Sequence, residues 1–311
     1  MNRQVAELLP ALEADTAARL LALERDVNEV RRQRDALARA TEGQGPAVAR
    51  QEDRLIPGPA GDIPVRVFVP EGDVAGAYLH LHGGGWVLGS EKNQDPVLRG
   101  IAAGAGVAVV SVGYRLAPEH PYPAGLDDCV AASRWLDTHA AEFGIEDPTR
   151  LAVGGESAGA NLAAATLLRR RDEMDEPFRA AVLTYGVFSA IYDLPSMKHM
   201  WDRNLVLSGP IMEFFSRAYA EGRDLRKPYI SPLYADLKGM PPAIFSVGTL
   251  DHLYSDTMLM AEAWRRAGNE AELHEYYDAP HGFTLFPGLD LAAAANERIV
   301  EFLRTHVGRQ I

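Results

Sequence analysis

The chain has 311 residues, of which 47% are hydrophobic, 24% charged and 8% aromatic. This composition is typical of a globular protein with a large buried core, and it excludes a disordered, collagen-like or coiled-coil chain for most of the length. The 31 basic and 43 acidic side chains give a net charge of −12, so we expect neither nucleic acid nor an anionic membrane among the partners.

Three further features narrow the class of protein. The single cysteine, Cys129, rules out an intramolecular disulfide and a cysteine-based zinc site. The first ten residues lack the basic start and the continuous apolar stretch of a secretory signal. The longest apolar run, residues 101–113, is interrupted by glycines and is too short to span a bilayer. We therefore predict a cytoplasmic protein with no membrane span.

Residues 1–45 are predicted to form N-terminal helices. Apolar side chains recur there at helical spacing among many charges, from Val5 to Val30. Pro10 is expected to break the first helix, because a proline inside a helix lacks the N–H and clashes with the preceding turn. The turn-forming residues 41–46 end the helical region.

From residue 46 onwards, short apolar strands alternate with helices, which predicts a mostly parallel sheet covered by helices on both faces. We assign residues 46–187 and 239–311 to this α/β domain. The expected elements in chain order are a β-hairpin (54–56 and 63–69), a strand at 75–81, a helix at 95–103, a strand at 107–112, a helix at 124–143, a strand at 151–153, a helix at 158–171, strands at 180–183 and 243–247, a helix at 254–267, a strand at 271–277 and a helix at 291–306. The last helix and the adjoining edge strand offer a surface for a homodimer.

Residues 188–238 interrupt the alternation and are predicted to form a helical insertion. The segment has no clear strand, is rich in aromatic residues and methionines, and contains the helix-start signal Ser208-Gly-Pro210. We interpret the insertion as a cap over a ligand pocket, completed by the N-terminal helices. The expected pocket residues are Trp86, Phe188, Trp201, Leu207, Phe214 and Phe215.

The strongest chemical motif is Gly155-Glu-Ser157-Ala-Gly159, which lies between a predicted strand and an alanine-rich helix. A serine on such a sharp strand-to-helix turn is held in a strained backbone conformation with its hydroxyl exposed, and the two glycines avoid clashes between strand and helix. The helix N-terminus adds a positive dipole end where negative charge develops. The motif therefore predicts that Ser157 is a nucleophile.

A second motif, His82-Gly-Gly-Gly-Trp86, follows directly on the strand that ends with His80-Leu81. Consecutive glycines allow adjacent N–H groups to point at one spot, as the stabilisation of an oxyanion requires. An HGGG-type loop upstream is what a nucleophile elbow needs, whereas a phosphate-binding loop would be followed by Lys-Ser or Lys-Thr. His80 and His82 are accompanied by no acidic or cysteine ligand pattern. We expect no metal and no organic cofactor.

A nucleophilic serine requires a base, and the base requires an orienting carboxylate. His281 lies in a loop between the last predicted strand and the last helix, and Asp251 follows the strand at 243–247. The chain order Ser157, Asp251, His281 is the one expected for a nucleophile-elbow fold, in which loops at the C-terminal ends of parallel strands meet. The nearby carboxylates that stay open as alternatives to Asp251 are Asp256, Glu275 and Asp278.

Together these motifs resemble the hormone-sensitive lipase-like family of α/β-hydrolases, which includes bacterial carboxylesterases. The resemblance covers about residues 45–308. It rests on His82-Gly-Gly-Gly, Tyr114-Arg-Leu-Ala-Pro-Glu-His-Pro-Tyr-Pro-Ala124 with Asp127-Asp128, Gly155-Glu-Ser-Ala-Gly159, Asp251-His-Leu and His281-Gly-Phe.

The resemblance implies an α/β-hydrolase fold with a helical cap, and it implies a role for each motif. Ser157 would be the nucleophile, His281 the base and Asp251 the orienting acid. The oxyanion would be held by the backbone amides of Gly83, Gly84 and Ala158.

Two positions depart from the pattern of the family. Glu156 stands where the family often has Asp, and His252 stands where a proline commonly follows the acid. Neither residue touches a proton-transfer atom, so we expect changes in local support and leave the role of Glu156 open. The segment Tyr114–Ala124 is interpreted as a rigid structural loop in which Arg115 and Glu119 can pair.

The predicted function is a serine carboxylesterase that hydrolyses short to medium acyl esters of small molecules through an acyl-enzyme intermediate. The bulky Trp86 beside the oxyanion loop and the aromatic cap favour a bounded pocket. A small-molecule amidase or deacetylase would use the same three residues and stays open as an alternative. A non-catalytic receptor for a small hydrophobic molecule is a second alternative, against which the complete set of Ser157, Asp251 and His281 argues.

Overall fold

The computed structural model describes residues 1–145, 147, 149–175 and 178–308, so the last three residues assigned to the α/β domain lie outside it. An eight-stranded sheet has the order β1-β2-β4-β3-β5-β6-β7-β8. The strands β1 (Arg50–Gly58), β2 (Gly61–Val69) and β4 (Ala108–Val112) pair antiparallel in that order. All further pairs are parallel, through β3 (Ala77–Leu81), β5 (Leu151–Glu156), β6 (Phe178–Thr184), β7 (Ala243–Leu250) and β8 (Ala271–Pro280). The predicted mostly parallel sheet is confirmed.

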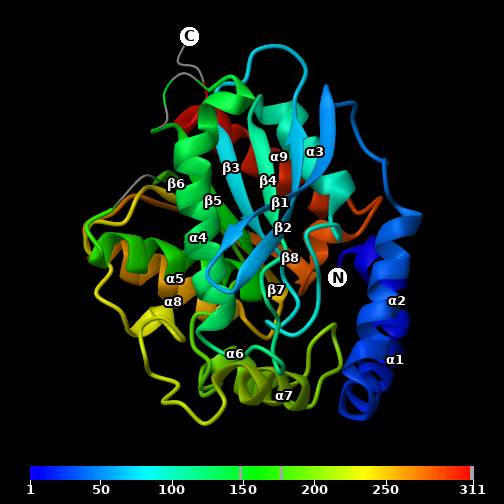
Figure 1. The fold of residues 1–311 in the computed structure, drawn as a ribbon. Coiled ribbons are helices and arrows are strands. Elements are labelled where there is room, and N and C mark those ends of the chain that lie inside the picture. Colours follow the sequence, from blue (N-terminus) through cyan, green and yellow to red (C-terminus); the bar gives the residue numbers. More distant parts are fainter. Residues whose placement is uncertain (146, 148, 176–177, 309–311) are drawn as a thin grey trace.

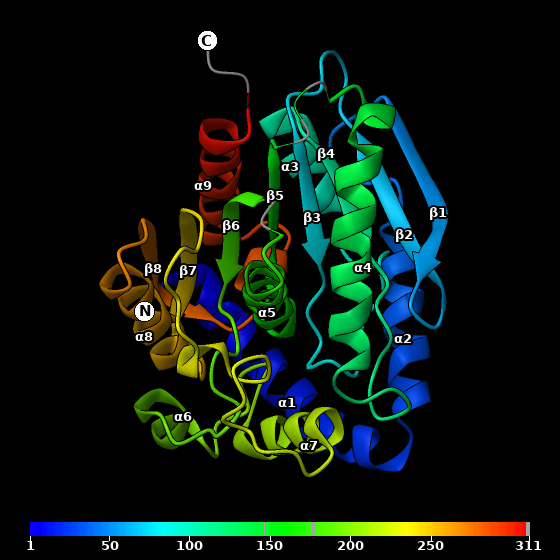
Figure 2. The same cartoon turned by 60° about the vertical axis from the view of Figure 1, so that its left-hand side comes forward.

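Helices cover both faces of the sheet, as the fully buried apolar strands require. One face carries α3 (Asp95–Ala105) and α9 (Asp290–His306), which pack against each other. The other face carries α4 (Ala124–His139), α5 (Ala158–Asp172) and α8 (Tyr254–Arg266) (Figures 1 and 2). Short 3₁₀ turns follow α4 at Ala140–Phe143 and precede α9 at Phe283–Leu285. This is the layered architecture of an α/β-hydrolase.

The N-terminal segment forms α1 (Arg3–Arg25) and α2 (Val27–Ala40). The prediction that Pro10 breaks the first helix is wrong, because α1 continues through it. Pro10 and the preceding turn at Ala6 are exposed, so water can reach the carbonyl group that lacks its helical partner. The chain breaks instead at Asp26, whose side chain accepts the N–H of Asn28 at 2.9 Å and caps α2.

Residues 188–238 form two helices and long connecting loops between β6 and β7. The helices α6 (Pro195–Met200) and α7 (Gly209–Ala220) lie together with α1 beyond the C-terminal ends of the parallel strands (Figures 1 and 2). A 3₁₀ turn at Pro232–Tyr234 precedes the return to the sheet. The segment is anchored where it leaves β6, because the N–H groups of Phe188 and Ser189 donate to Oδ1 of Asp256 on α8 at 3.0 and 2.8 Å.

The carboxyl group of Asp256 is buried, and burial raises its pKa from 3.8 to about 8, against the effect of the two backbone N–H groups. A carboxyl group whose pKa is higher in the folded state stabilises the fold most below its unfolded pKa, and this contribution is lost as the pH rises towards 8. Asp256→Asn keeps the Oδ1 acceptor and removes the titration. We therefore expect the melting temperature of Asp256→Asn, relative to the wild type, to rise by a few degrees between pH 5 and 8.

The measurement is thermal unfolding followed by circular dichroism at several pH values. Glu262→Gln, an exposed substitution on the same helix, is the control and should not produce this trend. A difference between Asp256→Asn and the wild type that stays constant over the whole pH range would show that Asp256 does not titrate as described.

Candidate active site

The turn between β5 and α5 holds Ser157 in a backbone conformation with φ 57° and ψ −121°, which non-glycine residues rarely adopt. The N–H of Ser157 donates to the carbonyl oxygen of Thr184 on β6 at 3.0 Å. A Cβ atom added to Gly155 or Gly159 would lie 2.0 or 1.9 Å from the carbonyl oxygen of Leu81, at the end of β3. The two glycines thus allow the turn to pack directly against the neighbouring strand, and the strained turn expected from the motif is present.

The structure places three predicted residues in one hydrogen-bonded chain. The Oγ atom of Ser157 lies 3.0 Å from Nε2 of His281, and Nδ1 of the same ring lies 2.8 Å from Oδ2 of Asp251. Asp251 follows β7 and is fully buried, His281 follows β8 and is 5% exposed, and Ser157 is 8% exposed. A protonated Nδ1 that donates to the carboxylate leaves Nε2 to accept the hydroxyl proton, as base-assisted attack by serine requires.

The groups that hold this hydrogen-bonded chain in place also lie at the ends of the strands. The second carboxylate oxygen of Asp251 accepts the N–H of Leu253 at 2.8 Å, and the ring of Tyr185, just after β6, packs edge-on against the imidazole of His281 at 4.8 Å. His252 directs its Nε2 atom to the carbonyl oxygen of Arg203 at 3.1 Å, which is a structural contact. Residues that follow β5, β6 and β7 therefore contact the imidazole, which is itself carried by the loop after β8.

The alternative carboxylates contact other groups. Asp278 accepts the N–H of Asn2 at 2.6 Å, Glu275 accepts the hydroxyl group of Tyr254, and Asp256 holds the start of the insertion. Among the described residues, Asp251 is the carboxylate hydrogen-bonded to His281. The geometry therefore selects Asp251 from the four carboxylates that the sequence left open.

The glycine loop departs from the prediction at its first glycine. The N–H of Gly83 donates to Oε1 of Glu156 at 2.9 Å, so this amide is already occupied, contrary to the prediction that Gly83 is an oxyanion donor. Gly84 and Gly85 have φ angles of 130° and 63°. Within the described residues, the N–H groups of Gly84, Gly85 and Ala158 donate to no protein acceptor. Gly85, the third glycine of the motif, was not among the predicted oxyanion donors.

Glu156 lies at the centre of a buried polar network that answers the question the sequence left open. Its Oε1 atom accepts the amides of Gly83 and of the Gln94 side chain, and Oε2 lies 3.1 Å from Nε2 of His80. The other ring nitrogen of His80 lies 3.0 Å from Oγ of Ser111 on β4. Burial alone would raise the pKa of Glu156, but His80 and the hydrogen bonds hold it below its ordinary value. An ionised carboxylate thus ties the glycine loop to β3, next to the nucleophile.

Two of the predicted pocket residues are enclosed by the protein. Trp86 is 1% exposed, stacks on Tyr219 of α7 with ring centroids 4.4 Å apart, and donates its indole N–H to Asn161 at 3.3 Å. Phe188 is fully buried and packs edge-on against Phe245 of β7. Neither side chain offers a surface to a substrate in this structure, because both serve the packing between the sheet, α5 and α7.

The other predicted pocket residues come from the insertion. Trp201 and Phe214 are half-buried, whereas Leu207 and Phe215 are buried. A Cβ atom on Gly85 would lie 2.3 Å from the ring of Phe215, so α7 packs directly against the glycine loop. The insertion therefore borders the site through this contact.

The segment 114–124 forms ion pairs that differ from the expected one. Arg115 pairs with Asp128 at 2.8 Å, and Glu119 pairs with Arg31 of α2 at 2.8 Å. The expected Arg115–Glu119 pair is wrong, because the N-terminal helix supplies the partner of Glu119. The guanidinium group of Arg31 also donates to the carbonyl oxygens of Val87 at 2.9 Å and Ala117 at 2.7 Å. This face of α2 therefore lies against the segment that follows the glycine loop.

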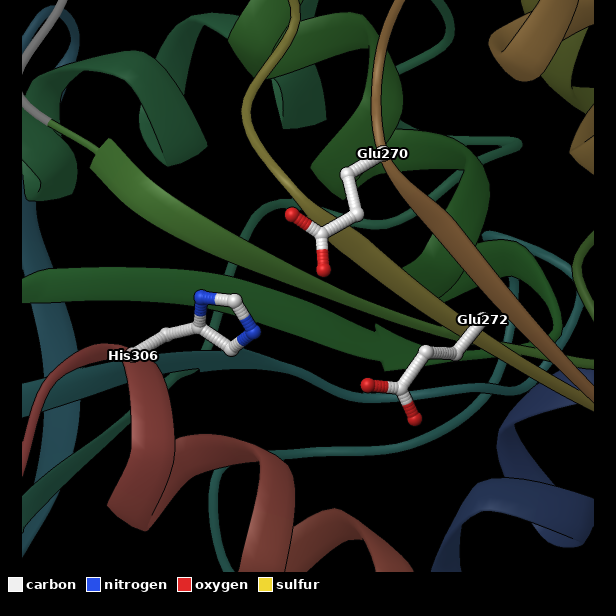
Figure 3. A group of neighbouring side chains, drawn as sticks. All are labelled: Glu270, Glu272 and His306. Atoms are coloured by element: carbon white, nitrogen blue, oxygen red, sulfur yellow. The ribbon is translucent and has the colours of Figure 1, made fainter.

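One group of potential metal ligands lies away from this site. Within the described residues, the ligand atoms of Glu270, Glu272 and His306 lie within 4.8 Å of one another, at the start of β8 and the end of α9 (Figure 3). Both glutamates are exposed, and the group lies at the end of the sheet opposite to Ser157. No helix of the described chain is long and apolar enough to cross a membrane.

The network around Glu156 predicts the effect of removing its carboxylate. Glu156→Ala leaves the Gly83 amide without its acceptor and frees the glycine loop, so kcat for a short ester should fall by roughly tenfold or more, with a smaller change in KM. Glu156→Gln keeps an acceptor for Gly83 and should retain most of the rate. Steady-state kinetics on p-nitrophenyl acetate, with a melting curve for each variant, measures this. A folded Glu156→Ala protein with the wild-type kcat would contradict it.

A family model described as the alpha/beta hydrolase fold matches residues 78–285. The carboxylesterase NlhH of Mycobacterium tuberculosis is 40% identical over 240 residues, 75% of each chain, and the ethyl acetate hydrolase of Pseudomonas putida is 34% identical over 254 residues, 79% of each chain. The crystal structure of an α/β-hydrolase enzyme from the metagenome of Lake Arreo has a TM-score of 0.91 with 31% identity and covers 99% of both chains. The chain therefore belongs to the α/β-hydrolase family, and its resemblance to the hormone-sensitive lipase-like members is confirmed.

Proposed function

We propose that the protein is a serine carboxylesterase that hydrolyses short to medium acyl esters of small molecules. The observation that carries this proposal is the hydrogen-bonded chain from Ser157 through His281 to Asp251, which faces the end of a glycine loop with free amides. Its relatives named as a carboxylesterase and an ethyl acetate hydrolase support the same reaction class.

The proposed reaction has two acyl-transfer steps. His281 takes the hydroxyl proton at Nε2 while Ser157 Oγ attacks the ester carbonyl, and the protonated imidazole then gives its proton to the leaving alcohol. A water molecule, deprotonated by the same nitrogen, attacks the acyl-enzyme and releases the acid. Asp251 stabilises the positive imidazolium ring in both steps and keeps its orientation.

The proposed oxyanion donors are the N–H groups of Gly84, Gly85 and Ala158. Ala158 is the first residue of α5, so its amide is one that no helical carbonyl can accept, and the dipole of the helix favours negative charge there. Gly84 and Gly85 have left-handed φ angles that turn their peptide groups away from regular structure. Gly83 is assigned to the anchoring of the loop on Glu156.

The size limit of the substrate is proposed from the packing of the cap. Phe215 contacts the glycine loop at Gly85, and Trp86 and Tyr219 form a stacked, buried pair behind it. The bulk of Phe215 against the glycine loop favours a bounded acyl site. Hydrolysis of amides by the same residues, a homodimer and a cytoplasmic location stay predictions of the sequence.

Replacement of the nucleophile tests the proposed function. Ser157→Ala should lower kcat on p-nitrophenyl butyrate by at least about 10³-fold, because covalent catalysis is lost while the fold is kept. A fluorophosphonate probe should label the wild type and fail to label the variant, which also separates an enzyme from a non-catalytic receptor. Unchanged turnover by folded Ser157→Ala would refute the assignment.

Acyl-chain length tests the bounded site. On p-nitrophenyl esters from acetate to palmitate, kcat/KM should pass through a maximum at short or medium chains, since longer chains must leave the site and lose contact with it. Phe215→Ala removes bulk beside Gly85 and should move the maximum to longer chains. A steady rise of kcat/KM up to palmitate in the wild type would be evidence for an open, lipase-like groove.

A further inference from the structure

Arg34 lies on the face of α2 that contacts the active-site loops. Arg31, one turn earlier, donates to the carbonyl oxygens of Val87 and Ala117, and Ala38, one turn later, is buried. Residues three or four positions apart share a helix face. Arg34 is half-buried, so its side chain is directed along this inner face and not into bulk solvent.

The positive charge of Arg34 acts on groups in both parts of the site. Burial lowers the pKa of Arg34, and the positive charge of Arg19 lowers it further, whereas Glu156 opposes the shift. The pKa of His82, at the start of the glycine loop, is lowered to about 3 mainly by burial, with Arg34 contributing. The same charge acts on Tyr185, whose ring packs on His281.

Arg34 also differs from the comparable arginines in having no partner. Within the described chain, each of the other arginines that is not exposed makes a hydrogen bond or an ion pair with the protein, and Arg34 makes none. These arginines are Arg19, Arg31, Arg54, Arg66, Arg99, Arg115, Arg150, Arg169, Arg170, Arg171 and Arg223. The N–H donors of this half-buried cation are therefore available to a partner from outside the chain.

In the part of the chain that the structure describes, the nearby acidic groups do not pair with Arg34. Glu156 already accepts hydrogen bonds from Gly83, Gln94 and His80, and within the described residues Asp35 forms no ion pair with Arg34. Arg19 also acts on Arg34 with its positive charge, although it pairs with Asp15 on its own helix. The guanidinium fork matches the two oxygens of a carboxylate better than any neutral group.

We propose that Arg34 binds a carboxylate carried by the ester substrate, so that the preferred substrates are monoesters of dicarboxylic acids or acyl esters of hydroxy acids. This inference rests on the proposed function and names its substrate class. The carboxylate would lie between α2 and the glycine loop while the ester carbonyl lies at Ser157.

The test uses two matched pairs of esters at pH 7, where the free carboxyl groups are ionised. Monoethyl glutarate and diethyl glutarate carry the charge or its neutral counterpart on the acyl side. 4-Acetoxybenzoate and its methyl ester carry the charge, or its neutral counterpart, on the alcohol side of the acetyl ester. Acid release from the glutarates, or the absorbance of the released 4-hydroxybenzoate or methyl 4-hydroxybenzoate, gives kcat/KM for the wild type, Arg34→Gln, Arg34→Lys and Arg39→Gln. Arg39, exposed on the same helix, controls for the loss of one positive charge.

The quantity measured is the ratio of kcat/KM for the anionic ester to that for its neutral counterpart. In at least one pair, Arg34→Gln should lower this ratio by roughly 10- to 100-fold, the usual effect of losing a charge-assisted hydrogen bond. Arg34→Lys should restore part of the ratio, and Arg39→Gln should leave it unchanged. Added salt should lower the wild-type ratio more than that of Arg34→Gln. The pair that responds identifies the side of the ester that carries the anion.

Two results would overturn the inference. One is an equal ratio in the wild type and Arg34→Gln for both pairs, and the other is an equal loss on anionic and neutral esters that Arg34→Lys does not reverse, which indicates a structural role. In both cases the neutral esters are still hydrolysed in a manner that depends on Ser157. Failure of the proposed function itself would instead appear as no hydrolysis of any ester and no labelling by fluorophosphonate.

Discussion

The whole site depends on how closely the turn around Ser157 approaches the end of β3. Gly155 and Gly159 both lie against the carbonyl oxygen of Leu81, at distances that leave no room for a side chain. The glycine loop starts at the next residue, so this contact places the loop beside the nucleophile, and a Cβ atom on Gly83 would lie 3.4 Å from Cβ of Ser157. A looser turn would separate the hydroxyl from the amides that are proposed to hold the oxyanion.

The buried carboxylate of Glu156 also holds the glycine loop beside the nucleophile. The carboxylate of Glu156 collects donors from the glycine loop, from Gln94 and from His80, so three neighbouring segments are joined at one point. The result is a division of roles within one motif, in which the first glycine anchors the loop and the following two are left free.

The N-terminal helices contribute contacts and charges around the site that the α/β domain does not provide. Arg31 joins α2 to the segment after the glycine loop through two carbonyl groups and Glu119, so the helix is part of the support of the site. Thr16 of α1 accepts the N–H of Val206 at 2.9 Å, which ties the insertion to the same helices. Arg34 lies on the same face of α2 as Arg31 and is half-buried there.

The sequence by itself determined the features that depend on local residue patterns. Apolar strands alternating with helices specified the parallel sheet, and the glycines two residues either side of Ser157 specified a sharp turn, because they avoid clashes between the strand and the helix. The positions of Asp251 and His281 after successive strands also specified that they meet, since the C-terminal ends of parallel strands share one edge. Even there, the sequence ended β5 at Val153, whereas pairing with β3 and β6 extends it through Gly154 to Glu156.

The tertiary structure alone decided the features that depend on contacts between distant segments. Which carboxylate serves His281, which glycine amide is occupied by Glu156, and which partner Glu119 takes are each settled by side chains tens of residues away. The burial of Trp86 could not be predicted from the sequence either, because Trp86 packs against α7, a helix more than 120 positions later in the chain. Local patterns fix backbone geometry, but hydrogen-bond partners and exposure are set by packing, and packing exists only once the chain has folded.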